Sequence, residues 1–179
     1  PFQTSEIDLS NSVQSIAGLI ETSVEERISV EFDLDVDLGS IGADRAQIEQ
    51  ATINLVSNAA EAIEDSGTVK VRTGSRFCPS GYFEARSYPY ELPEGDFVFL
   101  EITDDGRGMS PDLQNRIFEP FFTTKFMGRG LGLAAVFGII RRHHGAITVE
   151  SLPGRGSRFT LYFPQVKEQH ELIELDRGA

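Results

Sequence analysis

The chain has too little cysteine and histidine to build either a disulfide framework or a typical transition-metal site. Cys78 is its only cysteine, and its three histidines show no CxxC or HxxxH spacing. A lone cysteine cannot form an internal disulfide, and structural zinc requires several cysteine or histidine ligands. These absences exclude a disulfide-stapled scaffold, weigh against a metal domain and fit a reducing compartment.

Basic charge and long apolar runs are also scarce. The chain has 28 acidic against 16 basic residues and a formal net charge of −12, whereas duplex nucleic acid requires a basic face. We therefore expect no nucleic-acid partner. The longest apolar run, residues 130–140, is too short to cross a bilayer and predicts a buried helix. The abrupt start at Pro1, without a signal peptide, indicates a piece of a longer protein and leaves a membrane segment in that parent open.

The remaining composition is that of one globular domain in which helices and strands are interspersed. The closing strand pair, joined by the turn at residues 152–156, is a hairpin. This favours an α+β fold, a two-layer sandwich whose mixed, mostly antiparallel sheet is covered on one face by helices. We expect the domain to occupy residues 1–165 and a charged tail or linker to occupy residues 166–179. Helices are predicted over residues 9–26, 44–67 and 130–144, strands over residues 28–34, 68–73, 96–103, 146–151 and 157–163, and a long connection over residues 74–95.

The predicted helix from Asp44, which Asp44 caps and Gln47 completes as a capping box, carries two asparagines one turn apart. Asn54 and Asn58 are mediocre helix formers because their amides compete for the backbone. They belong to a polar stripe that also contains Gln47, Gln50 and Glu61. The side expected to face the sheet contains Ile48, Thr52, Leu55, Ala59 and Ile63. The stripe is either a solvated helix face or a pair of amide oxygens that hold a hard cation such as Mg²⁺ beside phosphates.

Three glycine-rich stretches follow along the chain. Residues 104–108, Asp-Asp-Gly-Arg-Gly, come after a predicted strand and indicate a tight turn. Residues 128–132 place glycines at the start of a helix, where they allow either close packing or an anion facing the backbone N–H groups. Residues 154–156 are typical of a hairpin turn. Neither a Walker P-loop nor a dinucleotide fingerprint fits, because GxxxxGK[ST] is absent and the stretch before Gly128 is a poor strand.

Five motifs in this order resemble the catalytic, ATP-binding domain of sensor histidine kinases, within the wider family of gyrase, Hsp90 and MutL ATPases. They are "NLVSNAAEAI" (N box), "DDGRGM" (first glycine box), "FEPFFTTK" (F box), "GRGLGL" (second glycine box) and "GRGSRF" (third glycine box). The wording is most similar to the nitrogen-regulator and hybrid kinase branch. The resemblance implies the Bergerat ATP-binding fold, in which ATP lies between the helical layer and a lid over residues 110–129.

The resemblance also implies which residues contact ATP. Asp104 is expected to accept a hydrogen bond from the adenine amino group, and Gly106 and Gly108 to let the backbone approach the nucleotide. Asn58 and Asn54 are expected to hold Mg²⁺ and, with Lys125, to serve catalysis. Further nucleotide contacts are expected from the lid and the helix start, namely Phe122, Thr123, Thr124, Lys125, Arg129, Gly130, Leu131, Gly132 and Leu133.

Asn54 favours phosphoryl transfer over hydrolysis. In the hydrolytic relatives, a glutamate four residues before the N-box Asn acts as a general base, and an amide cannot take up a proton at neutral pH. Glu61 and Ala62 depart from the family pattern, because many histidine kinases carry a lysine and an aromatic residue there. This departure keeps an alternative open, a degenerate module that holds nucleotide or a partner without phosphotransfer.

No histidine lies in the H-[DE]-x-x-x-P setting of the family's phosphoacceptors. His143 and His144 are expected to end a helix, and His170 lacks the later proline. We therefore expect a monomer that binds ATP without phosphorylating itself. Its expected partners are a separate dimerisation and phosphoacceptor domain and, downstream, the receiver domain of a response regulator. The resemblance places it in the cytoplasmic part of a sensor kinase whose membrane attachment the sequence leaves open.

Overall fold

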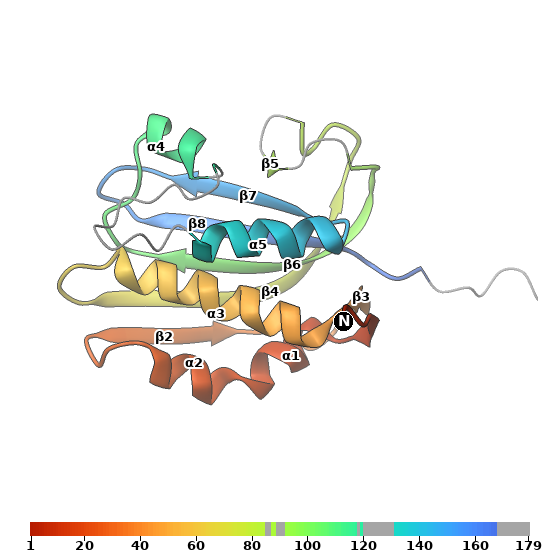
Figure 1. Ribbon diagram of the computed structural model, residues 1–179, viewed down its shortest axis with the longest axis horizontal. Helices are drawn as coiled ribbons and strands as arrows, with labels where there is room; N and C mark the ends of the chain where they lie inside the picture. The colour runs from red at the N-terminus through yellow and green to blue at the C-terminus, as the bar shows by residue number, and fades with distance from the viewer. Residues whose placement is uncertain (85–86, 89–91, 118, 120–130, 168–179) are drawn as a thin grey trace, which may run out of the picture.

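Helices cover one face of a six-stranded sheet whose strand order is β2-β4-β6-β8-β7-β5 (Figure 1). The structure is a computed structural model that describes residues 1–84, 87–88, 92–117, 119 and 131–167. β2 runs parallel to β4, and the other neighbouring pairs in this sheet are antiparallel. The expected two-layer α+β sandwich with a mixed, mostly antiparallel sheet is confirmed.

The elements follow the predicted order. The strands of the large sheet are β2 (Ile28–Asp33), β4 (Gly67–Cys78), β5 (Ser87–Tyr88), β6 (Gly95–Asp104), β7 (Ala146–Ser151) and β8 (Ser157–Pro164). A separate antiparallel pair consists of β1 (Ser5–Ile7) and β3 (Ile41–Ala43). The helices are α1 (Leu9–Ser15), α2 (Ala17–Ser23), α3 (Arg45–Glu61), α4 (Pro111–Arg116) and α5 (Leu131–Arg142).

The main core lies between the helices and the sheet. Alternate residues of β6, such as Leu100 and Ile102, pack in one cluster with Ile48 and Leu55 of α3, and all four are almost completely buried. Each such side chain contributes about 1.5–3 kcal/mol relative to an exposed one. The intervening residues of β6 face the other side, where Phe97 joins a smaller aromatic cluster beneath the β4–β6 connection. The predicted apolar side of α3 is thereby confirmed as its sheet-facing side.

Two predicted helix boundaries are wrong. The helix expected over residues 9–26 is broken at Ile16 into α1 and α2. Just before the break, the Ser15 hydroxyl donates to the Ser12 carbonyl at 2.7 Å, a side-chain hydrogen bond that competes with the helical backbone pattern. The helix expected to reach Gly67 ends at Glu61. After it, the Arg27 guanidinium donates to the Ile63, Glu64 and Asp65 carbonyls at 2.7–3.1 Å and holds the chain in a turn.

The connection expected over residues 74–95 is shorter than predicted. β4 continues to Cys78, and β5 adds an edge strand next to β7. Gly74 lies within the strand opposite Phe99 of β6, whose ring occupies the position where a side chain at Gly74 would stand, and the ladder continues to the pair Cys78–Gly95. The predicted tail also begins with ordered backbone, since Val166 N–H donates to the Ser40 carbonyl at 2.8 Å.

His143 takes the place of the predicted capping box at the start of α3. Asp44 caps the helix, and its carboxylate accepts from the Gln47 N–H at 3.4 Å. The Asp44 N–H, however, donates to Nε2 of the buried His143 ring at 3.0 Å rather than to Gln47. In the part of the chain that the structure describes, the Gln47 Oε1 atom is buried without a hydrogen-bond partner. α3 and the end of α5 are therefore tied together by a histidine.

Both histidine predictions at the end of α5 agree with a helix terminus. His144 has a φ of 54° and follows the last turn, while Gly145 N–H reaches back to the Ile140 carbonyl at 3.0 Å. This is the left-handed ending that commonly stops helices. No helix among the described residues is long and apolar enough to cross a membrane.

Candidate functional site

The polar stripe of α3 meets the start of α5 on the helical face of the sheet. α3 and α5 lie side by side there, with the start of α5 next to the middle of α3 (Figure 1). The Asn54 amide donates to the Gly132 carbonyl at 3.4 Å. Asn54 and Asn58 are both half-buried. The structure thus brings together one metal-binding candidate and one glycine that the motifs place 78 residues apart.

Asp104 lies at the end of β6 and is nearly inaccessible, with 4% of its surface exposed. Its Oδ1 accepts the Gly106 N–H at 2.9 Å. Burial raises the pKa of the Asp104 carboxyl, while hydrogen bonds from the backbone of Gly106 and Ser157 act in the opposite direction. A buried carboxylate with spare acceptor capacity favours a ligand that brings its own N–H donor.

The glycines of the first and third boxes are needed for close packing against other parts of the protein's own backbone. A Cβ on Gly106 would meet the Ala62 carbonyl, and one on Gly108, whose φ is 67°, would meet the Leu152 carbonyl. A Cβ on Gly156, whose φ is 80°, would meet the Asp104 carbonyl. The expected approach of Gly106 and Gly108 to a nucleotide stays a prediction, added to this packing role.

Two residues support the Asp104 turn without belonging to the predicted site. The Ala62 carbonyl accepts the Arg107 N–H at 3.0 Å, which joins the end of α3 to the turn. Ser157 pairs with Asp104 in the β6–β8 ladder and its backbone hydrogen-bonds the Asp104 carboxylate. The third glycine box was the only sequence signal for Ser157, and none pointed to a backbone carbonyl at Ala62.

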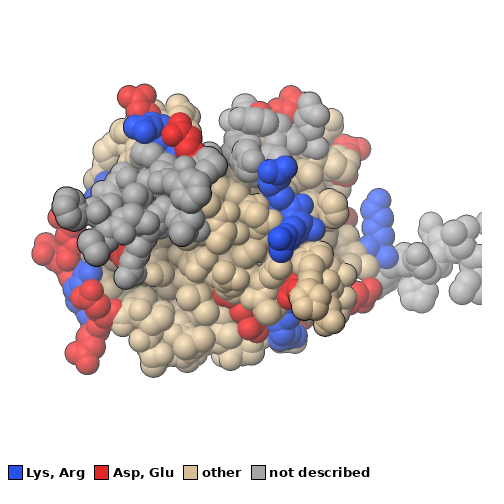
Figure 2. All heavy atoms as spheres, in the orientation of Figure 1, with Lys and Arg blue, Asp and Glu red and all other residues tan. Residues whose placement is uncertain are grey.

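In the described part of the chain, the start of α5 presents backbone N–H groups rather than charged side chains. Among the described residues, nothing lies within 4 Å of a Cβ placed on Gly132, so a side chain there would enter open space. Leu133 packs partly on the main core. Figure 2 shows basic side chains gathered at the other end of α5, where Arg141 and Arg142 lie. Within the described ranges, a phosphate group at this helix start would therefore meet backbone N–H groups and not these arginines.

Most lid predictions fall outside the described residues. These are Phe122, Thr123, Thr124, Lys125, Arg129 and Gly130. Leu131 begins α5, and its side chain is likewise outside the description. Their expected nucleotide contacts stay predictions.

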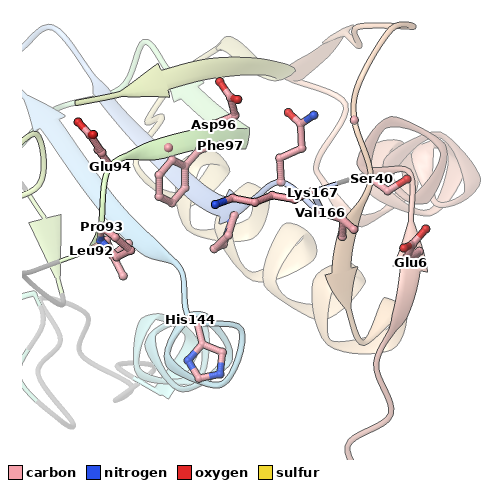
Figure 3. A pocket seen from close by; sticks show the side chains of 14 residues that line it. Glu6, Ser40, Leu92, Pro93, Glu94, Asp96, Phe97, His144, Val166 and Lys167 are labelled. Carbon is pink, nitrogen blue, oxygen red and sulfur yellow. The ribbon is translucent and has the colours of Figure 1, made fainter. Parts of the chain in front are cut away.

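A groove of about 1150 Å³ opens at the opposite end of the sheet from Asp104 (Figure 3). It lies beside the first residues of β6 and the exit of β8, and Figure 3 shows Glu6, Glu94 and Asp96 around it with Lys167. None of the predicted site residues lines it. We prefer the Asp104 end as the candidate site, because the turn after Asp104 is joined to the end of α3 through the Ala62 carbonyl and Asn54 of α3 contacts the start of α5. The groove, in contrast, is a hollow between surface segments.

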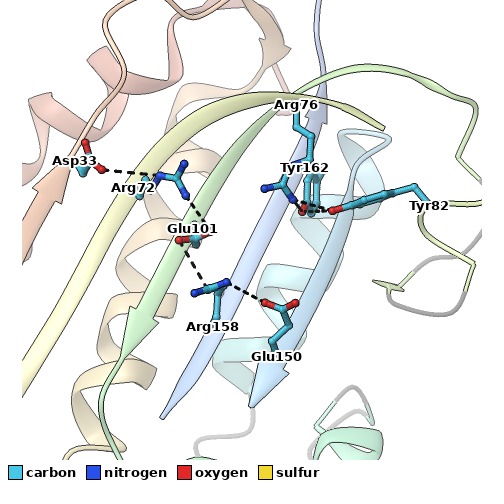
Figure 4. Close-up of polar contacts among 8 residues, drawn as sticks. All are labelled: Asp33, Arg72, Arg76, Tyr82, Glu101, Glu150, Arg158 and Tyr162. Carbon is cyan, nitrogen blue, oxygen red and sulfur yellow. Dashed lines mark hydrogen bonds and ion pairs between the residues drawn. The ribbon is translucent and has the colours of Figure 1, made fainter. Parts of the chain in front are cut away.

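A row of alternating charges crosses the face of the sheet that carries no helices (Figure 4). Arg72 lies 3.9 Å from Asp33 and 3.7 Å from Glu101, and Arg158 lies 4.0 Å from Glu101 and 3.2 Å from Glu150. Both arginines are thus flanked by carboxylates. The pairs with Asp33 and Glu150 are exposed and worth at most about 1 kcal/mol each, whereas the Glu101 carboxylate that both arginines share is buried. This row stabilises the sheet and is a poor phosphate site.

Comparisons with known proteins agree with the geometry. Residues 43–167 match the family described as histidine kinase-, DNA gyrase B-, and HSP90-like ATPase. The chain is 36% identical over 165 residues to sensor kinase CckA of Brucella abortus, covering 91% of this chain and 17% of that protein. It is 36% identical over 163 residues to the histidine-protein kinase AtoS of Escherichia coli, covering 90% of this chain and 24% of AtoS.

Another relative is the sensory histidine kinase/phosphatase NtrB of Vibrio alginolyticus, 34% identical over 92% of this chain and 45% of NtrB. The chain thus spans less than half the length of each of these three relatives.

Solved structures show the same fold. The nucleotide-free catalytic domain of histidine kinase ThkA superposes with a TM-score of 0.71 and 28% identity, over 91% of this chain and 96% of that domain. Full-length ShkA in complex with AMPPNP superposes with a TM-score of 0.73 over 93% of this chain and 32% of ShkA. The identity to ShkA is 24%, so this second likeness supports the fold alone.

Proposed function

The chain belongs to the histidine kinase-, DNA gyrase B- and HSP90-like ATPase family, as an ATP-binding catalytic domain of the histidine kinase type, and we propose that it positions Mg-ATP for γ-phosphoryl transfer to a histidine on a separate domain. The sandwich described above is the Bergerat fold of this family. The same proposal includes two partners, a dimerisation and phosphoacceptor domain and a downstream receiver domain. It also includes a cytoplasmic location and a monomeric state of this chain.

The observation that carries the proposal is the buried Asp104 carboxylate at the end of β6. Adenine presents an exocyclic amino donor, and a carboxylate with spare lone pairs matches it. Guanine has a carbonyl oxygen at that position, which a carboxylate repels. Asp104 therefore selects adenine over guanine at the base end of the site.

The phosphate end lies toward the asparagines of α3 and the start of α5. The N–H groups at the start of α5 face an anion favourably, because they have no partners within the helix. Asn54 holds the Gly132 carbonyl at 3.4 Å and so fixes the first turn of α5 against α3. Its amide cannot act as a general base on water, which leaves the γ-phosphoryl group for an incoming imidazole.

The asparagines fit a magnesium ion shared with phosphates. Within the described ranges, no group of three His, Cys, Asp or Glu side chains could hold a metal ion. Among the residues that the structure describes, none hydrogen-bonds the Asn58 amide. Mg²⁺ takes oxygen ligands and commonly shares few protein groups with substrate phosphates, so Asn58 and Asn54 are suitable donors. When bound, the ion neutralises phosphate charge during transfer.

Phosphotransfer in trans tests the proposal. The chain is mixed with labelled ATP, Mg²⁺ and the dimerisation and phosphoacceptor domain of a similar kinase such as CckA or NtrB, and acid-labile label on that domain is measured. We expect label on the acceptor domain and none on this chain. Nucleotide binding without label on any acceptor would favour the degenerate module instead. Steady release of free phosphate without acceptor would indicate a hydrolase.

A further inference from the structure

The backbone of Met109, the last residue of the first glycine box, is held on both sides by polar side chains. Its N–H donates to the Ser151 hydroxyl at 2.8 Å, and its carbonyl accepts from Nε2 of Gln114 at 3.3 Å. The same Gln114 nitrogen donates to the Ser151 carbonyl at 3.1 Å. Met109, Gln114 and Ser151 therefore form a closed ring of hydrogen bonds, which we call the Met109 clamp.

The Met109 clamp joins three parts of the molecule that are separate in sequence. Gln114 lies on α4, Ser151 ends β7, and Met109 follows the turn that begins at Asp104. The Ser151 hydroxyl donates to the Gly156 carbonyl at 3.0 Å, so its 2.8 Å contact with Ser157 is accepted from the Ser157 hydroxyl. The clamp thus reaches the third glycine box as well.

Among the residues that the structure describes, few buried side chains attach α4. It is a helix of six residues capped by Ser110, and none of its own side chains is fully buried. Leu113 packs partly on the core, and Ile117 directly after the helix is buried. Elements with few buried apolar contacts open locally at low cost. In the described part of the chain, the two hydrogen bonds of Gln114 link α4 to Met109 after the Asp104 turn and to the end of β7.

We propose that Gln114 is a positioning residue that couples α4 to the adenine-binding turn through Met109. The inference rests on the proposed ATP site. A base bound at Asp104 restrains the turn and the Met109 peptide, and Gln114 transmits that restraint to α4. Conversely, α4 held in place keeps the Met109 peptide in the orientation that the turn requires for binding.

Two isosteric variants test the need for the amide donor. Gln114→Met keeps the length of the side chain and removes its N–H groups, and Gln114→Glu adds a carboxylate facing two carbonyl oxygens. We expect ADP to bind about three- to tenfold more weakly to Gln114→Met, and more weakly still to Gln114→Glu. Asn115→Met, on the exposed side of the same helix, is the matched control and should bind ADP like the wild type.

Hydrogen exchange separates coupling from a general loss of structure. In the wild type, ADP should slow exchange in residues 104–109 and 111–117 together. In Gln114→Met, ADP at saturating concentration should still protect residues 104–109 but leave residues 111–117 unprotected. A Gln114→Met and Ser151→Ala double variant should show less than the sum of the two single effects, because both act through the Met109 peptide.

Equal ADP affinity and equal protection of α4 in Gln114→Met and wild type would overturn the coupling while leaving the ATP site intact. A folded wild type that binds no ADP would overturn the proposed function, and this inference with it.

Discussion

Burial of the Asp104 carboxylate lowers the stability of the folded protein, and we propose that the same carboxylate binds the ligand. Its carboxylate is almost fully buried, and its pKa is raised because burial disfavours the charged form. Backbone N–H groups of Gly106 and Ser157 and the positive charge of Arg107 partly offset the effect of burial, while the neighbouring Asp105 charge adds to it. Residues that recognise a ligand often destabilise the unliganded protein, because their partner is missing until the ligand binds.

Replacing Asp104 should therefore stabilise the unliganded protein. The raised pKa means that the folded state holds the proton more tightly than the unfolded chain. Stability from this group is present below the ordinary pKa and is lost as pH rises through the folded pKa. At pH 7, Asp104→Asn should raise the free energy of unfolding, measured in urea without nucleotide, because the amide carries no charge that burial would disfavour. A less stable variant would show that the carboxylate is needed for the fold itself.

His143 is a second residue whose charge state is set by the fold. Its Nε2 accepts the Asp44 N–H at 3.0 Å, so the proton of the neutral ring lies on Nδ1 and is donated to the Ile139 carbonyl at 2.7 Å. Burial lowers the pKa of His143, and the neighbouring Arg142 and His144 lower it further, although Asp44 and the Ile139 bond raise it. Protonation of Nε2 would remove the acceptor for the Asp44 N–H.

Stability should consequently fall on mild acidification. The lowered pKa keeps His143 neutral in the folded state, so its contribution is constant above pH 6.5, the ordinary value, and decreases below it as the unfolded chain takes up the proton. The slope is at most about 1.4 kcal/mol per pH unit for one proton. Urea unfolding between pH 7 and 5.5 should show a smaller slope in His143→Gln. The exposed His144→Asn is the control, and an equal loss of slope there would contradict the assignment.

At the scale of single elements, we expect the two glycines within α5 to differ in function although they are alike in their surroundings. Gly132 and Gly138 both lie in α5, and among the described residues neither would bring a Cβ within 4 Å of another atom. Glycine in a helix costs up to about 1 kcal/mol relative to alanine. The fold therefore gives no reason for either glycine, but only Gly132 lies next to Asn54 at the predicted phosphate end.

The pair Gly132→Ala and Gly138→Ala separates fold from function. Both should be as stable as the wild type or more stable, by up to about 1 kcal/mol, in thermal or urea unfolding. Only Gly132→Ala should weaken ATP binding, because a methyl group would stand where the backbone approaches phosphate. Unchanged ATP affinity in Gly132→Ala would move the phosphates away from this helix start.

Element types follow from the sequence because they depend on local periodicity. The apolar residues that recur along the helix from Asp44 predict the correct element and its buried face, and the strand expected over residues 96–103 is found as β6. Boundaries fail where distant contacts decide them. The end of α3 depends on Arg27 holding the carbonyls after Glu61, and no pattern within the helix shows that.

The predicted site divides in the same way. Asp104, Asn54 and Gly132 are predicted from the order of the motifs. The structure places Asn54 against Gly132, and the nucleotide contacts of all three stay predictions. Gln114 and Ser151 are missed, since a glutamine and a serine 37 residues apart make no motif. Their role depends on the packing of α4 on the end of β7, which only the three-dimensional structure shows.

At the scale of the molecule, the proposed base site at Asp104 and the first and last described segments of the chain lie toward opposite ends of the sheet. β6 runs from Gly95 to Asp104, so roughly 30 Å separate its two ends. Both β1 and the exit of β8 attach to β3 or its neighbouring residues near the Gly95 end, through Ile7–Ile41 pairing and the Val166–Ser40 bond.

Calorimetric titration of the folded chain with ADP, with and without Mg²⁺, tests the central claim most directly. The account predicts binding that strengthens with Mg²⁺ and that weakens by roughly 1–3 kcal/mol in Asp104→Asn, because asparagine loses one acceptor oxygen and presents an amide donor toward the adenine amino group. Binding that is the same in Asp104→Asn, or absent from the folded wild type, would contradict an adenine site at this buried carboxylate.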